Sequence, residues 1–237
     1  MRLKLIAPLF LLAFAVFSEY SGLDLALARP FHDPVTNTWP LKNIYFTAGV
    51  LHSFGKDLVV YVMAGILMLF VGSLVLTRLR ACRKGAAYML LGGLTSPAIV
   101  AIMKSRTHIY SPWDLALFGG DKPYIRLFDT VPAGSPVGHA FPGGHSSGGF
   151  AFLTLFFLIG FYRPRYRFLG LAVGILAGGV FAATQEMRGA HFLSHDLVSA
   201  VICWYVALGF FHLMYRHEPR GDKAATRGAK EGSVYAV

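Results

Sequence analysis

Six apolar segments restrict the folding of this chain more than any other feature. They cover approximately residues 5–17, 58–76, 86–103, 148–162, 168–183 and 197–215. A helix needs about 20 mainly apolar residues to cross a bilayer, and its backbone polar groups must be satisfied internally. The first, fourth and fifth segments are shorter than this, so we expect their helices to extend into flanking residues. The sequence therefore predicts an all-α, polytopic bundle of six transmembrane helices.

The composition agrees with a membrane protein. Hydrophobic residues make up 55% of the 237 residues, and charged residues make up 14%, against about a quarter in soluble domains. This excludes a disordered chain and a coiled coil, and two cysteines are too few for a disulfide framework. The first apolar segment also resembles a signal peptide, but the weak Ala26-Leu27-Ala28 cleavage pattern lies far from the apolar run. We therefore expect a retained helix.

The positions of Lys and Arg predict the orientation. If both termini lie inside, the inner segments contain 14 of the 22 basic residues: Arg2, Lys4, Arg78, Arg80, Arg83, Lys84, Arg163, Arg165, Arg167, Arg216, Arg220, Lys223, Arg227 and Lys230. Basic residues concentrate in the cytoplasmic loops of membrane proteins. We therefore expect an integral protein of a bacterial inner membrane with cytoplasmic termini. The net charge of +10 is then a matter of topology, and nucleic acid is not an expected partner.

The expected domain organisation is simple. Residues 1–215 should form a single membrane-embedded domain, and residues 216–237 a basic cytoplasmic tail without apolar periodicity. Two external loops are long. Residues 18–57 contain prolines and aromatic residues and are expected to form an interfacial cap, whereas residues 104–147 are rich in Gly, Pro, His and charge.

Polar residues gather at the outer ends of three predicted spans. They are Lys104 and Arg106 after the third span; Gly143, Gly144, His145 and Ser146 before the fourth; and Arg188, His191, His195 and Asp196 between the fifth and sixth. Ionisable residues at membrane level are costly and are functional candidates by default. Because all three runs fall on the same side of the predicted topology, we expect an active site at the outer, periplasmic face.

The residue types in these runs suit phosphoryl transfer. Arg188, His191 and His195 have spacings of three and four, so a helix would place them on one face. Imidazole is a nucleophile and a proton carrier near neutral pH, and Lys and Arg side chains neutralise phosphate. The Gly143-Gly144 turn offers backbone N–H groups at a helix start, which favours an anion. This pattern predicts phosphoryl transfer through a phosphohistidine.

The three runs resemble, in order and spacing, the signature of the type 2 phosphatidic acid phosphatase superfamily, over about residues 100–200. These are six-span membrane phosphatases related to vanadium haloperoxidases, with motifs Lys-x6-Arg-Pro, Pro-Ser-Gly-His and Ser-Arg-x5-His-x3-Asp. The resemblance implies that His191 is the nucleophile, that His145 is the general acid and that Lys104 binds phosphate. It implies no cofactor and no metal.

The chain departs from this signature at several places. Ser111 stands where the first motif has Arg, and Gly143 where the second has Ser, so that Ser146 is a candidate for the missing hydroxyl. The third-motif Arg position is Gln185, and Arg188 lies only three residues before the nucleophile. Arg188 and Arg106 are candidates to replace the missing charge at the phosphate.

The carboxylate that orients the nucleophile in the family is also displaced. His195 occupies its position, and Asp196 follows one residue later. If residues 191–196 are helical, His195 faces His191 and Asp196 points away, at about 3.6 residues per turn. If Ser194 is a helix N-cap, Asp196 falls in the first turn. We favour His195 as the orienting residue and keep Asp196 as the alternative.

The sequence thus predicts a metal-independent membrane enzyme that removes or transfers a phosphate on a lipid phosphate or pyrophosphate. Lipid A, undecaprenyl pyrophosphate, phosphatidic acid and phosphatidylglycerol phosphate are all compatible substrates. One alternative is a non-catalytic lipid-binding or transport relative. The other is a membrane metal protein that uses ligands from His108, His139, His145, His191 and His195.

Overall fold

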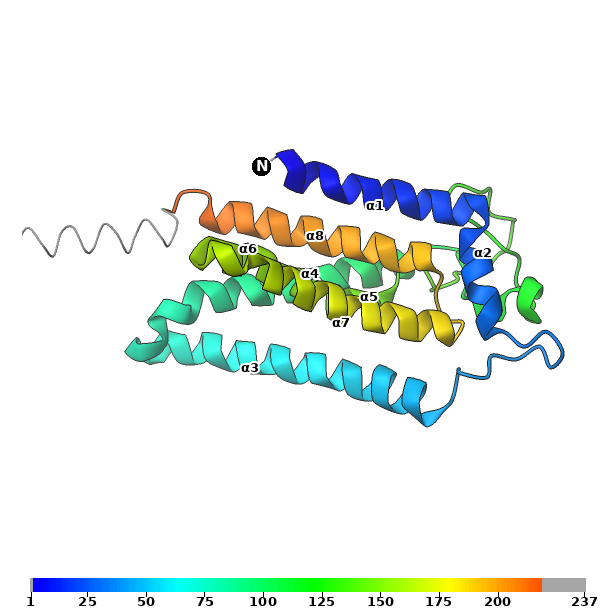
Figure 1. Ribbon diagram of the computed structural model, residues 1–237, viewed down its shortest axis with the longest axis horizontal. Coiled ribbons are helices and arrows are strands. Elements are labelled where there is room, and N and C mark those ends of the chain that lie inside the picture. Colours follow the sequence, from blue (N-terminus) through cyan, green and yellow to red (C-terminus); the bar gives the residue numbers. More distant parts are fainter. Residues whose placement is uncertain (1, 219–237) are drawn as a thin grey trace, which may run out of the picture.

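The computed structural model describes residues 2–218 and contains no β-strand in that range. Figure 1 shows long helices that lie side by side, with the shorter α2 across one end. The helices are α1 (Arg2–Ser21), α2 (Leu23–Ala28), α3 (Gly55–Val75), α4 (Arg83–Lys104), α5 (Gly144–Phe150), α6 (Thr154–Tyr162), α7 (Arg167–Met187) and α8 (Leu193–Tyr215). The predicted all-α fold is confirmed.

Six helical stretches are long and apolar enough to cross a membrane. They are Leu3–Ser21, Tyr45–Val75, Thr77–Lys104, Gly144–Tyr162, Pro164–Met187 and Leu193–Tyr215. Five of them contain a predicted span completely, and Tyr45–Val75 ends one residue before the predicted 58–76 does. The three short predictions gain the flanking residues that we expected. The chain is therefore an integral membrane protein built as a six-helix bundle.

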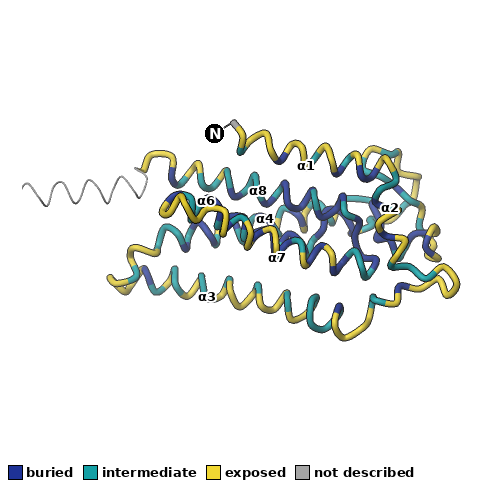
Figure 2. Tube along the Cα trace, viewed as in Figure 1, coloured by how far each residue is buried: buried dark blue, intermediate teal, exposed yellow. Residues whose placement is uncertain are grey.

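Glycines allow the fourth and fifth spans to pack closely. A Cβ atom at Gly178 of α7 would lie 2.1 Å from the Phe150 ring, and one at Gly174 would lie 2.7 Å from the backbone of Leu153. Small residues spaced four apart let helix backbones approach, which is the usual packing device in membranes. By contrast, α3 lies at the side of the bundle, and much of its surface is exposed to the lipid region (Figure 2). The helices of the fourth and fifth spans therefore form a tightly packed centre of the bundle.

The cap between the first two spans is shorter than expected. Helix α1 continues to Ser21, and a π-helix, Tyr45–Phe54, runs directly into α3. The expected cap at residues 18–57 is therefore reduced to about residues 22–44, because both of its flanks are apolar enough to extend the spans. Within the cap, Trp39 is buried and packs against Phe118.

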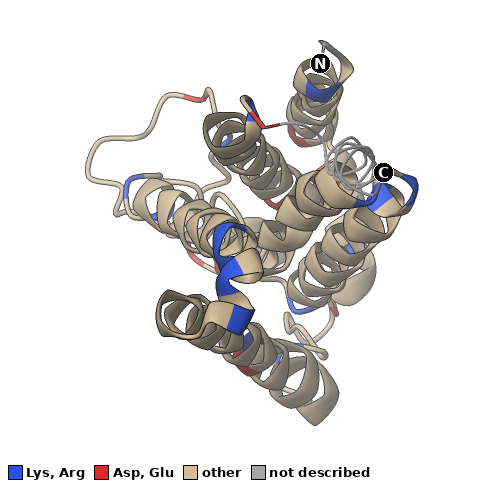
Figure 3. Ribbon diagram, turned by 90° about the vertical axis from the view of Figure 1, so that its left-hand side faces the viewer, with Lys and Arg blue, Asp and Glu red and all other residues tan. Residues whose placement is uncertain are grey.

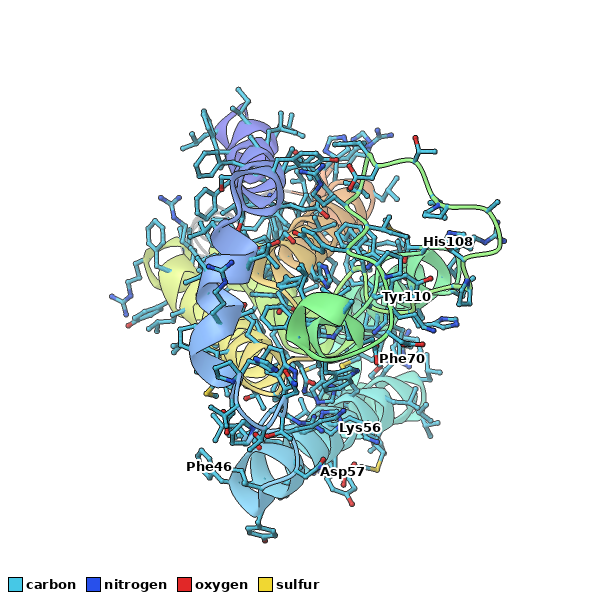
Figure 4. All side chains as sticks on the ribbon, turned by 90° about the vertical axis from the view of Figure 1, so that its right-hand side faces the viewer. Phe46, Lys56, Asp57, Phe70, His108 and Tyr110 are labelled. Atoms are coloured by element: carbon cyan, nitrogen blue, oxygen red, sulfur yellow. The ribbon has the colours of Figure 1, made fainter. Side chains whose placement is uncertain are left out.

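The two ends of the bundle differ in charge. The α3–α4 and α6–α7 connections contain Arg78, Arg80, Arg83, Lys84, Arg163, Arg165 and Arg167. Figure 3 looks onto this end, where Lys and Arg lie on several of the helix ends and where the N-terminus also lies. The opposite end carries the cap and the long loop after α4 (Figure 4). The structure therefore brings these basic connections together at one end of the bundle, and the side of the membrane that this end faces stays a prediction. Most of the expected tail at 216–237 lies outside the described residues.

Candidate active site

The glycine-rich turn before α5 is fastened to the start of α8. The backbone N–H of Gly143 donates to the His195 carbonyl at 3.0 Å, and the Ser199 hydroxyl donates to the Gly143 carbonyl at 2.8 Å. The Ser146 hydroxyl donates to Oδ1 of Asp196 at 2.6 Å. The second and third sequence runs, about 50 residues apart, therefore form one hydrogen-bonded unit.

Gly143 is required by this arrangement. A Cβ atom at Gly143 would lie 2.0 Å from Asp196 Oδ1 and 2.7 Å from Ser146 Oγ. The space that a serine would need at this position is therefore occupied by the Asp196 carboxyl group. The glycine at the second-motif serine position and Asp196 therefore depend on each other, because the carboxyl group fits only where residue 143 has no side chain.

Lys104 brings a positive charge to the same turn. It is the last residue of α4, and its Nζ lies 3.3 Å from the position of a Cβ atom on Gly144. Lys104 also interacts electrostatically with Asp196 and with His191. The end of α4, the start of α5 and the start of α8 therefore meet around this ammonium group.

His191 lies in the turn between α7 and α8. Helix α7 ends at Met187 and α8 begins at Leu193, so the condition under which Arg188, His191 and His195 would share a helix face is not met. Of the two conformations considered, the non-helical stretch with Asp196 in the first turn of α8 is the one observed, although the N-cap is Phe192 and not Ser194. The helix is interrupted at Gly189, which has a φ of 75°, a conformation that glycine adopts readily. The tertiary structure nevertheless brings the two histidines together: their ring centroids are 5.9 Å apart, at an interplanar angle of 65°.

Both imidazoles are buried and incompletely hydrogen-bonded. His191 is 6% exposed and His195 1% exposed, and Nδ1 of each ring has no hydrogen-bond partner. Burial, followed by the charge of Lys104 and the neighbouring His195 ring, lowers the pKa of His191 well below its usual value of 6.5. His191 is therefore a neutral imidazole around pH 7, the form that can act as a nucleophile.

Asp196 is engaged elsewhere. Its Oδ1 accepts from Ser146, and its buried Oδ2 has no hydrogen-bond partner. Asp196 lies in the first turn of α8, and no hydrogen bond joins it to His191. No hydrogen bond joins His195 to His191 either, and the contact between them is the ring approach, with 5.9 Å between centroids.

Sequence reasoning missed a second buried carboxyl group, Asp24. Oδ1 of Asp24 accepts from the Ser194 backbone N–H at 3.1 Å and from the Ser18 hydroxyl at 2.6 Å. Asp24 therefore caps the start of α8 from the cap helix α2, in place of a local N-cap side chain. Burial raises its pKa. No local signal could have revealed a partner 170 residues away.

His145 has a partner that the sequence did not suggest. Its ring stacks on His52 with 4.0 Å between centroids, and its Nε2 lies 3.0 Å from the His52 carbonyl oxygen. The charges of Arg188, Lys56 and Lys104 all act on His145. Lys56 lies at the start of α3, on the side that faces the bundle (Figure 4).

Two of the predicted phosphate-binding residues, Arg106 and Ser111, make no described contact with the histidine and lysine cluster. Arg106 is exposed and has no side-chain hydrogen bond or ion pair among the described residues. Ser111 is buried, in a loop held by the Trp113 N–H bond to the Gly189 carbonyl at 3.0 Å. Arg188 is nearer to the cluster, and it donates from Nε to the Lys42 carbonyl at 2.9 Å.

The histidines do not form a metal site. Among residues 2–218, no group of three or more His, Cys, Asp or Glu side chains is arranged to hold a metal ion. His139 is exposed in the loop that follows α4, and His108 lies at its beginning (Figure 4). This arrangement does not support the metal-protein alternative.

The fold and the site together define an integral membrane protein with a histidine and lysine cluster at one end of a helical bundle. A family model described as the PAP2 superfamily matches residues 85–219, and the chain belongs to this superfamily. This membership supports phosphatase activity. No curated protein matches the chain. A solved structure described as the "first transmembrane PAP2 type phosphatidylglycerolphosphate phosphatase from Bacillus subtilis" is 18% identical, with a TM-score of 0.49, over 90% of this chain and 100% of that chain.

Proposed function

We propose that this chain is a lipid phosphate phosphatase with its active site at the periplasmic face of a bacterial inner membrane. The observation that carries the proposal is the meeting of His191, His145 and Lys104 around the Gly143–Gly144 turn. Residues 1–215 form the catalytic membrane domain in this proposal, and residues 216–237 form its cytoplasmic tail.

The proposed reaction uses a phosphohistidine. The neutral His191 attacks phosphorus, and the bond to the leaving oxygen breaks as His145 protonates that oxygen. Water or an acceptor alcohol, deprotonated by His145, then attacks the phosphohistidine and releases phosphate or a transfer product. Lys104 and Arg188 neutralise the charge on the phosphoryl oxygens, so the chemistry needs no metal. His195 orients His191.

An apolar groove supports a lipid substrate. It has a volume of about 680 Å³ and is lined by Leu11 of α1, Gly179 of α7 and Leu197 and Trp204 of α8. Its outer end reaches Asp196, whose other face binds Ser146 of the phosphate turn. From Asp196 to Trp204 the groove follows α8 for ~12 Å at about 1.5 Å per residue. One hydrocarbon chain of the substrate would fit this length.

The residues that line the groove include no Lys, Arg or His, and its only ionisable side chains are Glu186 and Asp196 at the outer end, so the groove offers no cation to a phosphate. We therefore assign the groove to the chain of the lipid and the His191–Lys104 cluster to its phosphate. Lipid A, undecaprenyl pyrophosphate, phosphatidic acid and phosphatidylglycerol phosphate all carry both parts, and the assay below separates them.

Release of phosphate from each lipid by the purified protein in detergent tests the proposal, with a chelator added in a parallel reaction. We expect turnover of at least one lipid, unaffected by the chelator, and loss of turnover in His191→Ala. A protein that binds lipid but releases no phosphate would instead be the non-catalytic relative.

The groove assignment is tested with Gly179→Leu. A Cβ atom at Gly179 would meet nothing within 4 Å, so the new side chain fills the groove without a backbone clash. We expect KM to rise at least tenfold for long-chain lipids and to stay unchanged for short-chain ones. Gly65→Leu on α3, where a Cβ atom also meets nothing within 4 Å, is the matched control. Equal effects on both chain lengths would contradict the assignment.

A further inference from the structure

His52 lies outside the three motif regions, yet it makes the closest ring contact of His145. It belongs to the π-helix Tyr45–Phe54, which precedes α3; π-helical turns are rare and are frequent at functional sites. The two imidazole rings are nearly parallel, at 16°, with centroids 4.0 Å apart. Phe181 contacts the same His145 ring at 5.4 Å. The orientation of His145 is therefore set by neighbours on this π-helix and on α7.

The backbone of His52 determines which nitrogen of His145 carries a proton. Nε2 of His145 lies 3.0 Å from the His52 carbonyl oxygen. A carbonyl oxygen only accepts, so Nε2 must be the N–H donor. Nδ1 of His145 is then left for the reacting group, and it is the nitrogen that gains and loses the catalytic proton.

The side chain of His52 is held by a hydrogen-bond network that includes Gln185 and Arg188. Arg188 Nη1 donates to the Gln185 Oε1 at 3.3 Å, which directs the amide nitrogen of Gln185 towards His52. This nitrogen lies 2.8 Å from Nδ1 of His52 and donates to it. Nδ1 of His52 is therefore unprotonated, and the ring carries its proton on Nε2.

A positive charge on His52 is disfavoured from every side. His145 of α5, Lys56 of α3 and Arg188 after α7 all act on this ring electrostatically. A proton on Nδ1 would also point at the Gln185 N–H group. Lys56 and Arg188 act on His145 as well, so the difference between the rings is the Gln185 N–H group, which occupies Nδ1 of His52, whereas no hydrogen bond among the described residues occupies Nδ1 of His145. His145 is therefore the ring that can accept a second proton.

We propose that His52 is a positioning residue that fixes the reactive nitrogen and the orientation of His145 and keeps the second ring of the pair neutral. This rests on the proposed function, in which His145 is the general acid. It also gives Gln185 a role: at the position where the resemblance places an arginine, Gln185 orients His52, and Arg188 orients Gln185.

The kinetic test compares two leaving groups. An alkyl phosphate needs a proton on its leaving oxygen, whereas p-nitrophenyl phosphate hardly does. We expect His52→Ala to lower kcat/KM, which reports the steps up to departure of the leaving group, roughly 10–100-fold on the alkyl substrate, a part of the range for a general acid, and less than about threefold on p-nitrophenyl phosphate. His52→Phe, which keeps a ring for stacking, should recover most of the alkyl activity. Equal losses on both substrates, or no loss on either, would overturn the proposal.

A second measurement does not depend on turnover. In ¹⁵N-histidine spectra of the full chain, assigned with His52→Phe and His145→Phe, we expect both neutral rings to carry the proton on Nε2. An Nδ1–H tautomer at either residue would contradict the inferred network. Wild-type protein with these tautomers but without phosphate release would refute the proposed function and leave the positioning of His145 established.

Discussion

The most direct test of the site geometry is Gly143→Ala. The new Cβ atom would lie 2.0 Å from Asp196 Oδ1, whereas ordinary contacts begin at 3.4 Å. The two groups must therefore separate by about 1.4 Å in a close-packed interior. This breaks the Ser146 hydrogen bond to Asp196, now 2.6 Å long. Overpacking costs roughly 1–3 kcal/mol, and losing a buried hydrogen bond costs a similar amount.

We expect Gly143→Ala to destabilise the protein by roughly 2–5 kcal/mol. At roughly 2–4 °C per kcal/mol for a domain of this size, the thermal unfolding midpoint in detergent should fall by about 4–20 °C. Gly148→Ala is the matched control in the same helix, because a Cβ atom there meets nothing within 4 Å. It should leave the midpoint unchanged or raise it slightly.

The double variant decides the cause. Asp196→Ala removes the obstructing carboxyl group, and the freed Ser146 hydroxyl can rotate away from the new methyl group. In that background Gly143→Ala should cost less than about 1 kcal/mol, which gives a coupling energy of at least about 1 kcal/mol. An equal loss in both backgrounds would show that Asp196 does not fill the space beside Gly143, and the reasoning would fail.

Three further outcomes are expected. His195→Ala should lower turnover roughly 10²–10⁴-fold, and His195→Asp should retain it; a mild effect of His195→Ala beside a severe effect of Asp196→Asn would move the orienting role to Asp196. Burial lowers the pKa of His191, so its inactive protonated form appears only in acid. As the pH is lowered, kcat/KM should therefore stay constant through pH 6.5, the usual histidine pKa, and fall only at lower pH. Ala133→Cys, in the exposed loop after α4, should react with an impermeant thiol reagent in intact inner-membrane vesicles of right-side-out orientation; reaction in inverted vesicles alone would reverse the topology.

The sequence determined the framework of this protein. Six apolar segments are sufficient to predict six spans, because a membrane leaves an apolar segment of this length few alternatives to a helix. The motif residues also predicted which side chains would gather: His145, His191, His195 and Lys104 come from three separated runs, and they meet at one end of the bundle.

The sequence could not predict the local conformation around the nucleophile. The spacing of three and four left both a helix and a helix start near residue 194 open, and the structure has a turn from Gly189 to the residue before Leu193. Local spacing describes only a helix that is already present, and here contacts from distant segments decide where it ends. Asp24 caps α8 from 170 residues away.

Tertiary structure alone decided how the departures from the motif fit together. Asp196 occupies the space beside Gly143, and Gln185 reaches His52 on another span. Each of these pairs joins residues that are distant in sequence. A short motif specifies the residue type at a position, but it does not specify how much space surrounds that residue or which hydrogen-bond donor lies next to it. Which chemical groups are present thus follows from the sequence, whereas the packing of the six helices determined which of them touch.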